Sequence, residues 1–391
     1  MSDNEILSVF EKLAADPVSD DIKSDEATRK RLYEAARTAM LKLESPWETV
    51  QRLSYLPQQL AVAQLGNQIK LWAHLTAQPS TTHALAASTG ADASFLRRIL
   101  RYAASQRMVE EVDEDSWRAT NITASMAVPG NEQGIIHAAE NCARPYLALP
   151  AYSQNAGYHD PSDSFHVPFQ VGHGTKQNLF QWLGSGHGNF EAFNRYMRAQ
   201  RLGAPVWLDK FRLEEYCDLD SKTERCEFVD VGGGQGHQCE GVVAKFPQLK
   251  GRVILQDLAP VLAKVLIPGV ENKVQDFFQP QAVTGAKVYY LRMILHDWPN
   301  AQCEVILKNL VAGMSKDGVL LIDELVLPRT GAHWYVTQMD IAMMCMLSAR
   351  ERSLGEWEAL LSASGLKMNK LVKYSEVGDS IIVAVPESRS V

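Results

Sequence analysis

The stretch that decides the fold is Phe228-Val-Asp-Val-Gly-Gly-Gly-Gln-Gly236, in which an apolar run leads into a glycine-rich turn. The apolar run predicts a buried strand, and the segment after the turn, HQCEGVVAKF, has apolar residues at helical spacing. Glycines at such a turn tolerate positive φ and let a ligand approach the backbone. A strand, a glycine turn and a helix in this order are typical of nucleotide-like ligands bound at the carboxyl end of a parallel sheet.

The spacing of the glycines narrows the choice of ligand. Dinucleotide-binding loops favour G-x-G-x-x-G, which would require glycine at position 237, where His237 stands. The run Gly232, Gly233 and Gly234, preceded by Asp230, is more typical of S-adenosylmethionine, with its methionine part along the loop. The sequence therefore predicts S-adenosylmethionine as the cofactor.

Working outward from this loop, short apolar runs alternate with helical stretches up to the C-terminus. The runs are EFVDV, RVILQ, KVYYL, GVLLIDEL and SIIVAV. This alternation predicts an α/β fold with a doubly wound, Rossmann-like sheet covered by helices on both faces. The last two candidate strands, LKMNKLVKY and DSIIVAV, leave no room for a helix between them and predict an antiparallel C-terminal hairpin.

Two acidic residues end successive predicted strands after the glycine loop. Asp257 ends RVILQD, where a carboxylate can accept two hydrogen bonds from a ribose diol. Asp276 ends the next short strand and is followed by Phe277, an acid beside a flat aromatic ring, which suits an adenine. For each acid alone a helix cap or a solvated loop end is the simpler interpretation, but the pair at successive strand ends favours a cofactor site.

The N-terminal part predicts helices and a small sheet. Helical periodicity in LAVAQLGNQIKLWAHL and SFLRRILRYAASQRMV, a capped helix in STTHALAASTG, and two short strands around Asp113–Asp115 form a winged-helix pattern. We interpret this module as a dimerisation domain rather than a DNA-binding one, because its wing is acidic. The predicted domains are a helical and winged-helix dimerisation domain (1–130), a helical connecting segment that contributes to the substrate pocket (131–225) and the cofactor domain (226–391).

Composition bounds the remaining possibilities. The chain has 391 residues, 46% of them hydrophobic, with a net charge of −7, which argues against nucleic acid or anionic membranes as partners. Six scattered cysteines and no long apolar run predict a soluble cytoplasmic protein with reduced thiols. Histidines in the irregular segment 158–188 match no metal-ligand spacing, so no metal is expected.

A third element, Tyr290-Leu-Arg-Met-Ile-Leu-His-Asp-Trp-Pro299, completes a recognisable set of motifs. DVGGGQG, LQDLAP, QDFF, LRMILHDWP, LLIDELVLP and RERSLGEW follow one another in the order and spacing of the plant-type, cation-independent small-molecule O-methyltransferases. Over residues 60–386 the chain resembles this family of caffeate and flavonoid methyltransferase-like enzymes, and its fungal secondary-metabolism branch. The resemblance implies a homodimer that methylates a hydroxyl group of a small aromatic or polyketide-like molecule.

The resemblance also implies roles for individual residues. His296 matches the general base, and Glu324 and Glu351 match the two acids that flank it. Asp257 and Asp276 match the ribose and adenine contacts, Arg292 takes the place of a basic residue near the cofactor, and Trp298 is expected near the adenine. Met197 matches a substrate-pocket methionine, and a predicted pocket helix carries Asp340 and Met343. A lone histidine before Asp-Trp-Pro can also cap a helix, and methionines at near-helical spacing are often core residues.

The chemistry explains why a base is useful here. A phenol, with a pKa of about 10, is mostly protonated at neutral pH, and a positioned histidine can remove its proton. Two other interpretations stay open. In the first, the same fold and cofactor catalyse dehydration or pericyclic ring formation without methyl transfer, with His137 or His173 as a different acid. In the second, the winged helix binds DNA and the α/β domain senses a ligand. The negative net charge of the chain and the presence of the complete catalytic set argue against this second interpretation.

Overall fold

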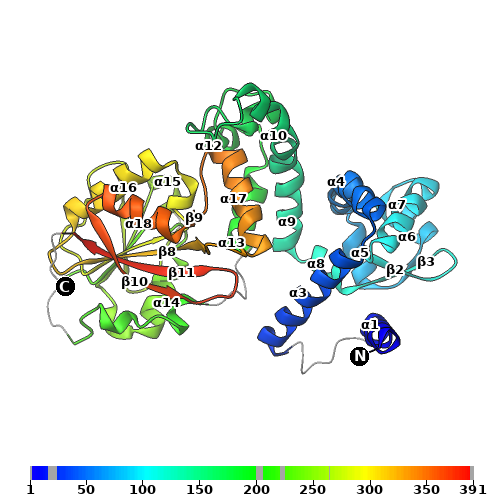
Figure 1. Cartoon of the computed structure of the whole chain (residues 1–391), viewed down its shortest axis with the longest axis horizontal. Coiled ribbons are helices and arrows are strands. Elements are labelled where there is room, and N and C mark those ends of the chain that lie inside the picture. The colour runs from blue at the N-terminus through cyan, green and yellow to red at the C-terminus, as the bar shows by residue number, and fades with distance from the viewer. Residues whose placement is uncertain (1, 16–23, 200–205, 221–224, 264, 388–391) are drawn as a thin grey trace. The chain divides into compact units, whose positions relative to one another are not determined.

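The computed structural model describes the chain except for residues 1, 16–23, 200–205, 221–224, 264 and 388–391 (Figure 1). The chain divides into two compact units, Met1–Leu65 and Gly66–Val391. The predicted domain boundaries at 130 and 225 both fall inside the second unit and stay predictions.

The first unit is built from helices. They are α1 (Asp3–Ala15), α3 (Glu26–Leu43) and the first part of α4 (Pro46–Gln68). The helix α3 begins after Asp25, whose carboxylate accepts a hydrogen bond from the Thr28 N–H and caps the helix. None of the residues of α3 is buried, and apolar side chains of α1 and α3 are exposed, among them Phe10, Tyr33 and Met40.

The second unit opens with the predicted winged-helix module. Its helices are α5 (Leu71–Ala77), α6 (Thr82–Thr89) and α7 (Ala93–Ser105), and its sheet has the order β1 (Ser80–Thr81), β3 (Ser116–Ala119), β2 (Val109–Asp113). The predicted capped helix is confirmed, with the Thr81 side chain at its start and Gly90, at a φ of 72°, at its end. Arg97 forms an ion pair with Asp115 of the wing turn at 3.0 Å.

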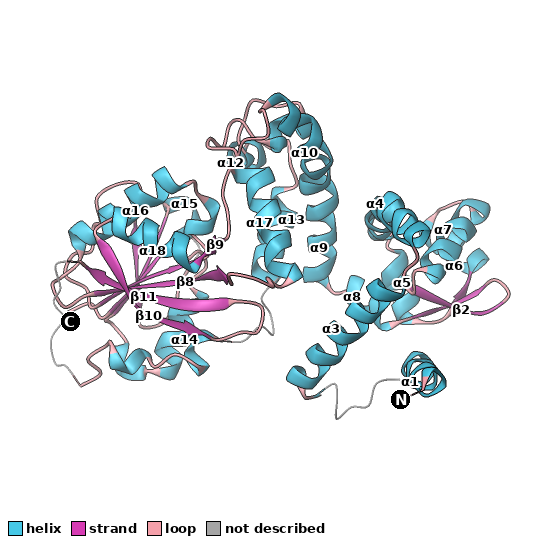
Figure 2. Cartoon of the chain, in the orientation of Figure 1, coloured by secondary structure: helices cyan, strands magenta, loops and turns pink. Residues whose placement is uncertain are grey.

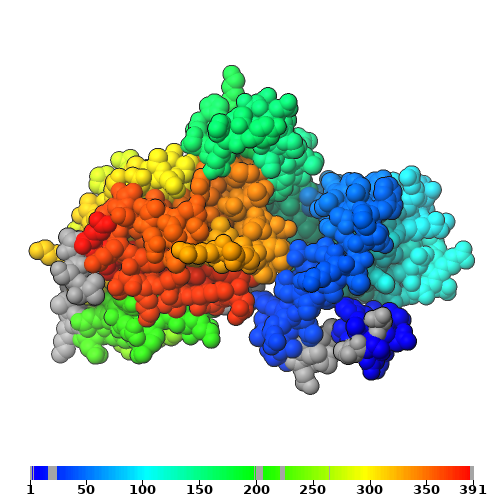
Figure 3. Space-filling model, in the orientation of Figure 1, coloured from blue at the N-terminus to red at the C-terminus, as the bar shows by residue number. Residues whose placement is uncertain are grey.

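A group of helices follows the module. They are α8 (Asn121–Met126), α9 (Pro129–His137), the π-helical turn η1 (Ala138–Cys142), α10 (Ala143–Asn155), α11 (Pro168–His173), α12 (Leu179–Gly184) and α13 (Phe190–Ala199). The later helix α17 (Trp334–Leu347) leaves the α/β domain and packs against α10 and α11. Figures 1 and 3 show α17, in orange, beside the green helices, so the C-terminal domain contributes one helix to this group.

The C-terminal domain is the predicted doubly wound sheet. Its main path runs in the order β10 (Leu366–Lys373), β11 (Asp379–Pro386), β8 (Val319–Leu327), β7 (Val288–Arg292), β4 (Phe228–Val231), β5 (Val253–Asp257), β6 (Val270–Val274), and the short β9 (Arg352–Ser353) pairs with β8. The strands β4 to β8 are parallel, and β10 and β11 form the predicted antiparallel hairpin. The strand order reverses beside β4, which is where such folds bind ligands.

Alternate strand residues explain why helices cover both faces (Figure 2). Phe228 faces a core made with α14 (His237–Lys245) and Trp207, whereas its neighbour Val229 faces a core made with α16 (Asn300–Gly313) and α18 (Leu354–Ala363). Both strand residues are completely buried, as expected for a parallel sheet covered on both sides. This packing holds the strand ends, and therefore the loops that follow them, in fixed positions.

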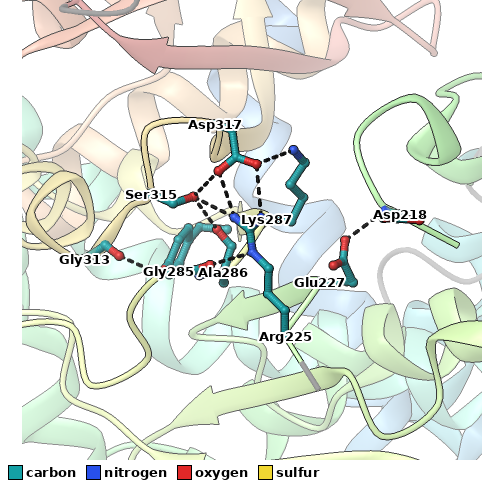
Figure 4. A network of polar contacts seen from close by, with 10 residues as sticks. Asp218, Arg225, Glu227, Gly285, Ala286, Lys287, Gly313, Ser315 and Asp317 are labelled. Carbon is teal, nitrogen blue, oxygen red and sulfur yellow. Dashed lines mark hydrogen bonds and ion pairs between the residues drawn. The ribbon is translucent and has the colours of Figure 1, made fainter. Parts of the chain in front are cut away.

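Charged residues close the amino end of the sheet (Figure 4). Arg225, Lys287 and Asp317 lie just before β4, β7 and β8, and Arg225 binds Asp317 through two hydrogen bonds of 2.9 and 3.0 Å. Lys287 adds an ion pair to Asp317 at 2.7 Å, and the Arg225 Nε donates to the Gly285 carbonyl at 2.8 Å. The Asp317 side chain is 50% exposed. This network ties three strand starts together.

Two sequence-based expectations concern the chain as a whole. All six cysteines are free thiols. Within the part of the chain that the structure describes, no helix combines the length and the apolar character that a membrane crossing needs.

Candidate active site

The glycine loop lies at the carboxyl end of β4, between β5 and β7. Gly232 has a φ of 74°, and a Cβ atom there would lie 2.7 Å from the Ile294 side chain, so only glycine fits. At Gly233 a Cβ atom would lie 2.5 Å from the Asp230 carboxylate. At Gly234, by contrast, a Cβ atom would meet nothing within 4 Å. The loop is therefore closely packed at Gly232 and Gly233 and open at Gly234.

Asp230 lies behind this loop. Its side chain is 1% exposed, and one carboxylate oxygen, Oδ1, has no hydrogen-bond partner. The other oxygen accepts from the Cys239 thiol at 3.6 Å. Burial raises the pKa of Asp230 to about 7. The predicted role of Asp230 in cofactor binding stays a prediction, and the geometry makes it a support for Gly233.

The two predicted cofactor acids end neighbouring strands. Asp257 is half-buried, and its Oδ2 accepts from the Gly234 N–H at 2.8 Å, which joins the end of β5 to the glycine loop. Burial raises the pKa of Asp257. Asp276 is exposed just beyond β6, and its Oδ1 accepts from the Phe278 N–H at 2.9 Å. The structure therefore brings Asp257 to the loop by a direct contact and places Asp276 at the next strand end.

Aromatic rings line the same end of the sheet. Phe277 lies 3.6 Å from the position of a Cβ atom on Gly232. Its ring meets the Trp298 ring edge to face, with centroids 6.0 Å apart, and Phe278 meets Trp298 in the same way at 4.8 Å. Phe180, from α12, stacks on Trp298 itself, with the ring centroids 6.2 Å apart. A cluster of aromatic rings thus lies beside the glycine loop.

Arg292 ends β7 and points into a buried polar network. Its guanidinium donates to the Asp323 carboxylate at 2.6 Å. Asp323 also accepts hydrogen bonds from the hydroxyl groups of Tyr290, at 2.5 Å, and Tyr374, at 2.6 Å. This network could not be predicted from the sequence, because its members come from β7, β8 and the residue after β10. The predicted cofactor contact of Arg292 stays a prediction.

His296 lies in the short turn η5 (Leu295–Asp297) that follows β7, and it is 6% exposed. Its Nδ1 lies 2.9 Å from the Glu351 Oε1, a hydrogen bond across 55 residues of sequence. Its Nε2 lies 3.4 Å from the Asp297 carboxylate. The predicted contact between His296 and a flanking acid is therefore present for Glu351.

Glu324 acts on the backbone of the same turn. Its Oε1 accepts from the N–H groups of Ile294 at 3.0 Å, Leu295 at 2.9 Å and His296 at 3.4 Å. Glu324 is completely buried, and its Oε2 has no hydrogen-bond partner. The Oε2 of Glu351 also has no hydrogen-bond partner. Burial raises the pKa of Glu324 to about 7. Glu324 thus flanks the histidine as predicted, but it binds the backbone that carries His296.

The charges around His296 decide its protonation. Burial alone disfavours the imidazolium, but Asp297, Glu324 and Glu351 outweigh burial and together raise the pKa of His296 to about 10. One ring nitrogen of His296 and one carboxylate oxygen each of Glu324 and Glu351 all lie within 4.8 Å of one another. The acidic residues around His296 therefore favour its protonated form.

The predicted substrate residues lie on the helices. Met197, on α13, is 39% exposed, and Met343, on α17, is partly buried against a core that includes Phe169 and Trp182. Asp340, also on α17, accepts the Glu351 N–H at 3.0 Å. Asp340 therefore links the predicted pocket helix to the partner of His296, a contact that the sequence does not reveal.

Comparison with known proteins identifies the family. A profile of the O-methyltransferase domain matches residues 166–367. The chain belongs to this O-methyltransferase family. It is 38% identical to the O-methyltransferase lepI of Aspergillus flavus, over 90% of this chain and 92% of that one. It is 36% identical to the 16-O-methyltransferase bsc6 of Alternaria brassicicola, over 94% of each chain.

Solved structures agree with this assignment. The structure of LepI in complex with S-adenosylmethionine is 36% identical, with a TM-score of 0.88 over 98% of this chain and 100% of that one. A structure described as a pericyclic reaction enzyme is also 36% identical, with a TM-score of 0.88 over 98% of each chain. The predicted family, fold class and cofactor are therefore confirmed. The comparisons do not distinguish methyl transfer from a pericyclic reaction, because both occur among relatives with this fold.

Proposed function

We propose that this O-methyltransferase family member transfers a methyl group to a hydroxyl group of a small secondary metabolite of aromatic or polyketide type. The observation that carries the proposal is the buried pair of His296 and Glu351, 2.9 Å apart, at the carboxyl edge of the sheet. This pair lies one strand away from the glycine loop, since His296 follows β7 and the loop follows β4. A base and a cofactor loop side by side are what hydroxyl methylation requires.

The residues at this edge fit S-adenosylmethionine. The bound cofactor supplies an electrophilic methyl group on a positively charged sulfur. The open backbone at Gly234 would hold the methionine part, the Asp257 carboxylate would accept from the ribose hydroxyl groups, and the apolar faces of Phe277 and Trp298 would contact the adenine. The unpartnered carboxylate oxygens of Glu324 and Glu351 add negative charge near a cationic ligand.

The hydrogen bonds around His296 support its proposed role as the general base. Because the Glu351 carboxylate can only accept, it takes the Nδ1–H, and the lone pair of the neutral imidazole lies on Nε2. Nε2 can then take the proton of the acceptor hydroxyl, and Glu351 stabilises the imidazolium that this proton transfer forms. The pKa of about 10 at His296 is matched to that of a phenol.

One observation favours a second candidate, a pericyclase or dehydratase that transfers no methyl group. With a pKa of about 10, His296 is protonated at neutral pH and can donate a hydrogen bond instead of accepting a proton. A cationic donor would stabilise negative charge that develops on a carbonyl or a leaving oxygen. The similarity to a pericyclic reaction enzyme supports the same alternative.

A labelled-methyl experiment separates the two. The purified chain is incubated with methyl-labelled S-adenosylmethionine and a panel of phenolic and polyketide acceptors, and product mass and S-adenosylhomocysteine are measured together. Equal amounts of labelled product and S-adenosylhomocysteine support methyl transfer. An acceptor that is converted without label, while the cofactor stays intact, supports the second candidate.

The pH dependence gives an independent test, because the two reactions need opposite forms of His296. Methyl transfer needs the neutral form, so kcat/KM rises with pH and levels off above the pKa of about 10. Donation by the imidazolium needs the protonated form, so activity is constant at neutral pH and falls as the pH rises through about 10. Replacing His296 with Gln should remove the limb in either case.

We also propose that the chain forms a homodimer through its first unit. The apolar side chains of α1 and α3 are exposed, and α3 buries none of its residues. The substitutions Tyr33→Glu and Met40→Glu in the full chain should shift the mass measured by light scattering from dimer to monomer. Glu34→Gln on the same helix is the matched control, and a wild-type monomer would contradict the proposal.

A further inference from the structure

Arg352 lies next to Glu351, at the start of β9, and its side chain is completely buried. Its guanidinium donates to the carbonyl oxygens of Leu295 at 2.8 Å and Trp298 at 3.0 Å. It also donates to the Asn300 side chain, at 2.9 and 3.1 Å, and to the Cys303 sulfur at 3.3 Å. Every one of these acceptors belongs to residues 295–303, the segment that begins with the His296 turn.

The environment of this arginine is unusual for a buried charge. Among the described residues its guanidinium forms no ion pair, and each of its acceptors is neutral. A buried charge without a direct counter-ion destabilises the folded state unless other charges compensate it. The carboxylate cluster around His296 compensates part of this charge: burial raises the pKa of Glu324, and the positive charge of Arg352 opposes that rise.

Arg352 and Glu324 hold the His296 turn from opposite sides of its peptide groups. Glu324 accepts from the N–H groups of residues 294–296, and Arg352 donates to the carbonyl groups of residues 295 and 298. The planar guanidinium is itself held 5.3 Å over the Trp357 ring of α18. The His296 turn is thereby held at both its N–H and its carbonyl groups by side chains of β8 and β9.

We propose that Arg352 is a positioning residue for the proposed methyl transfer: it fixes the backbone of the His296 turn and supplies the positive charge that balances the carboxylates around the histidine. The two parts of this role can be separated. A lysine keeps the charge but cannot reach the carbonyl groups of residues 295 and 298 together. A methionine keeps much of the volume and loses both the charge and the hydrogen bonds.

The charged groups that face His296 are known from every element around it. Asp297 lies in the same turn, Glu324 comes from β8 and Glu351 precedes β9. Asp340 of α17 reaches the cluster through the Glu351 N–H. All four are unchanged in a variant of Arg352, so a difference in the titration of His296 between variant and wild type reports on Arg352.

The test compares Arg352→Met and Arg352→Lys with Arg252→Met in the full-length protein. Arg252 is a matched control because it is also buried, at 9% exposure, and also donates to backbone carbonyls, those of Asp218 and Gln248. Three quantities are measured: the thermal midpoint, kcat and KM in the methyl-transfer assay, and the pKa of His296 by NMR of ¹³C-labelled histidine. The His296 signal is assigned with the His296→Gln variant.

We expect Arg352→Met to lower kcat about 100-fold and to raise the pKa of His296, because a positive charge is removed from its surroundings. Arg352→Lys should lower kcat about 10-fold and leave the His296 titration close to wild type. Arg252→Met should lower the thermal midpoint and leave kcat and the titration unchanged. KM for the cofactor should change less than kcat in all three.

Two results would overturn the proposal. The first is a folded Arg352→Met variant whose kcat and His296 acid dissociation constant both lie within twofold of wild type. Where Arg352→Met does not fold, the same two values in Arg352→Lys would overturn the proposal. The second is an equal effect of Arg252→Met on both quantities. If the wild-type chain transfers no methyl group at all, the proposed function fails, whereas the NMR titration still decides whether Arg352 controls His296.

Discussion

The two ends of the C-terminal sheet carry charged clusters of opposite character. At the amino end, Arg225 and Lys287 each pair with Asp317 at 2.7–3.0 Å, and all three side chains are partly exposed. At the carboxyl end, His296 and Glu351 are buried, and the Glu351 Oε2 has no partner. The same sheet therefore holds a partly exposed cluster whose charges are paired, and a buried cluster in which a carboxylate oxygen has no hydrogen-bond partner.

This difference in burial and pairing indicates which end of the sheet suits acid–base chemistry. Exposed ion pairs contribute little to stability, commonly below about 1 kcal/mol, and shift no group into the neutral pH range. Buried carboxylates cost stability and have shifted pKa values, which is the state that acid–base chemistry requires. We therefore expect changes at the carboxyl end to act on turnover and changes at the amino end to act weakly on folding.

The largest effect is expected from His296→Gln. Loss of the base should lower turnover by roughly 10²–10⁴-fold, while the dissociation constant of S-adenosylmethionine stays within about threefold, because the glycine loop is untouched. Turnover is measured with the labelled methyl group, and cofactor binding by calorimetry. The exposed His159→Gln serves as the control. Equal losses in binding and turnover would contradict the division of roles between His296 and the loop.

Next in size is Asp257→Asn. Loss of a carboxylate that accepts from the Gly234 N–H and is available to a ribose diol should weaken cofactor binding about 10–100-fold. The same calorimetry measures it, with Glu271→Gln on β6 as a control with an exposed acid. An unchanged dissociation constant in the folded variant would show that the cofactor does not use this strand end.

Glu324→Gln should change the pH dependence of stability. The folded-state pKa of about 7 lies above the unfolded value of about 4.5, so the wild-type chain loses stability as the pH rises from about 4.5 through 7. The variant has no such loss, and its stability relative to wild type should increase over this range, by up to a few kcal/mol. Urea unfolding at pH 5 and pH 8 measures the difference. A difference that is the same at both pH values would contradict the burial argument.

The smallest effect is expected from Asp317→Asn at the amino end. Hydrogen bonds from Arg225 and Lys287 lower the pKa of Asp317, so its contribution is present above the unfolded pKa of about 4 and is lost as the pH falls below it. Because the side chain is half-exposed, the loss at pH 7 should be about 1 kcal/mol or less, with turnover unchanged. Lys316→Gln is the neighbouring control. A loss of turnover would show that the two ends of the sheet are coupled.

The fold was largely predictable from the sequence because it depends on local patterns. The glycine turn, the alternation of strands and helices and the C-terminal hairpin are each carried by a short stretch of sequence. The site was predictable in its residue types, since His296, Glu324 and Glu351 belong to family motifs. Their separate roles were not, because the contact of Glu324 with the backbone of the turn depends on the register of β7 and β8.

Arg352 and Asp323 show the limit of such reasoning. Each lies beside a predicted site residue, in ERS and IDE, yet nothing in the sequence shows which way its side chain points. Arg352 reaches residues about 50 positions earlier, and Asp323 collects hydrogen bonds from β7 and from Tyr374 beyond β10. Only the packed sheet brings these partners together.

The division between sheet and helices has a consequence for how the enzyme can diversify. The groups that contact His296 and its turn come from β8 and from Glu351, just before β9, whereas Met197 and Met343 belong to α13 and α17. If Met197 and Met343 line the proposed substrate pocket, exchanging helix residues should change the acceptor preference without altering the residues around His296. The hydrogen bond from the Glu351 N–H to Asp340 crosses this division, so a library of pocket variants should keep Asp340 and vary the helix residues around it.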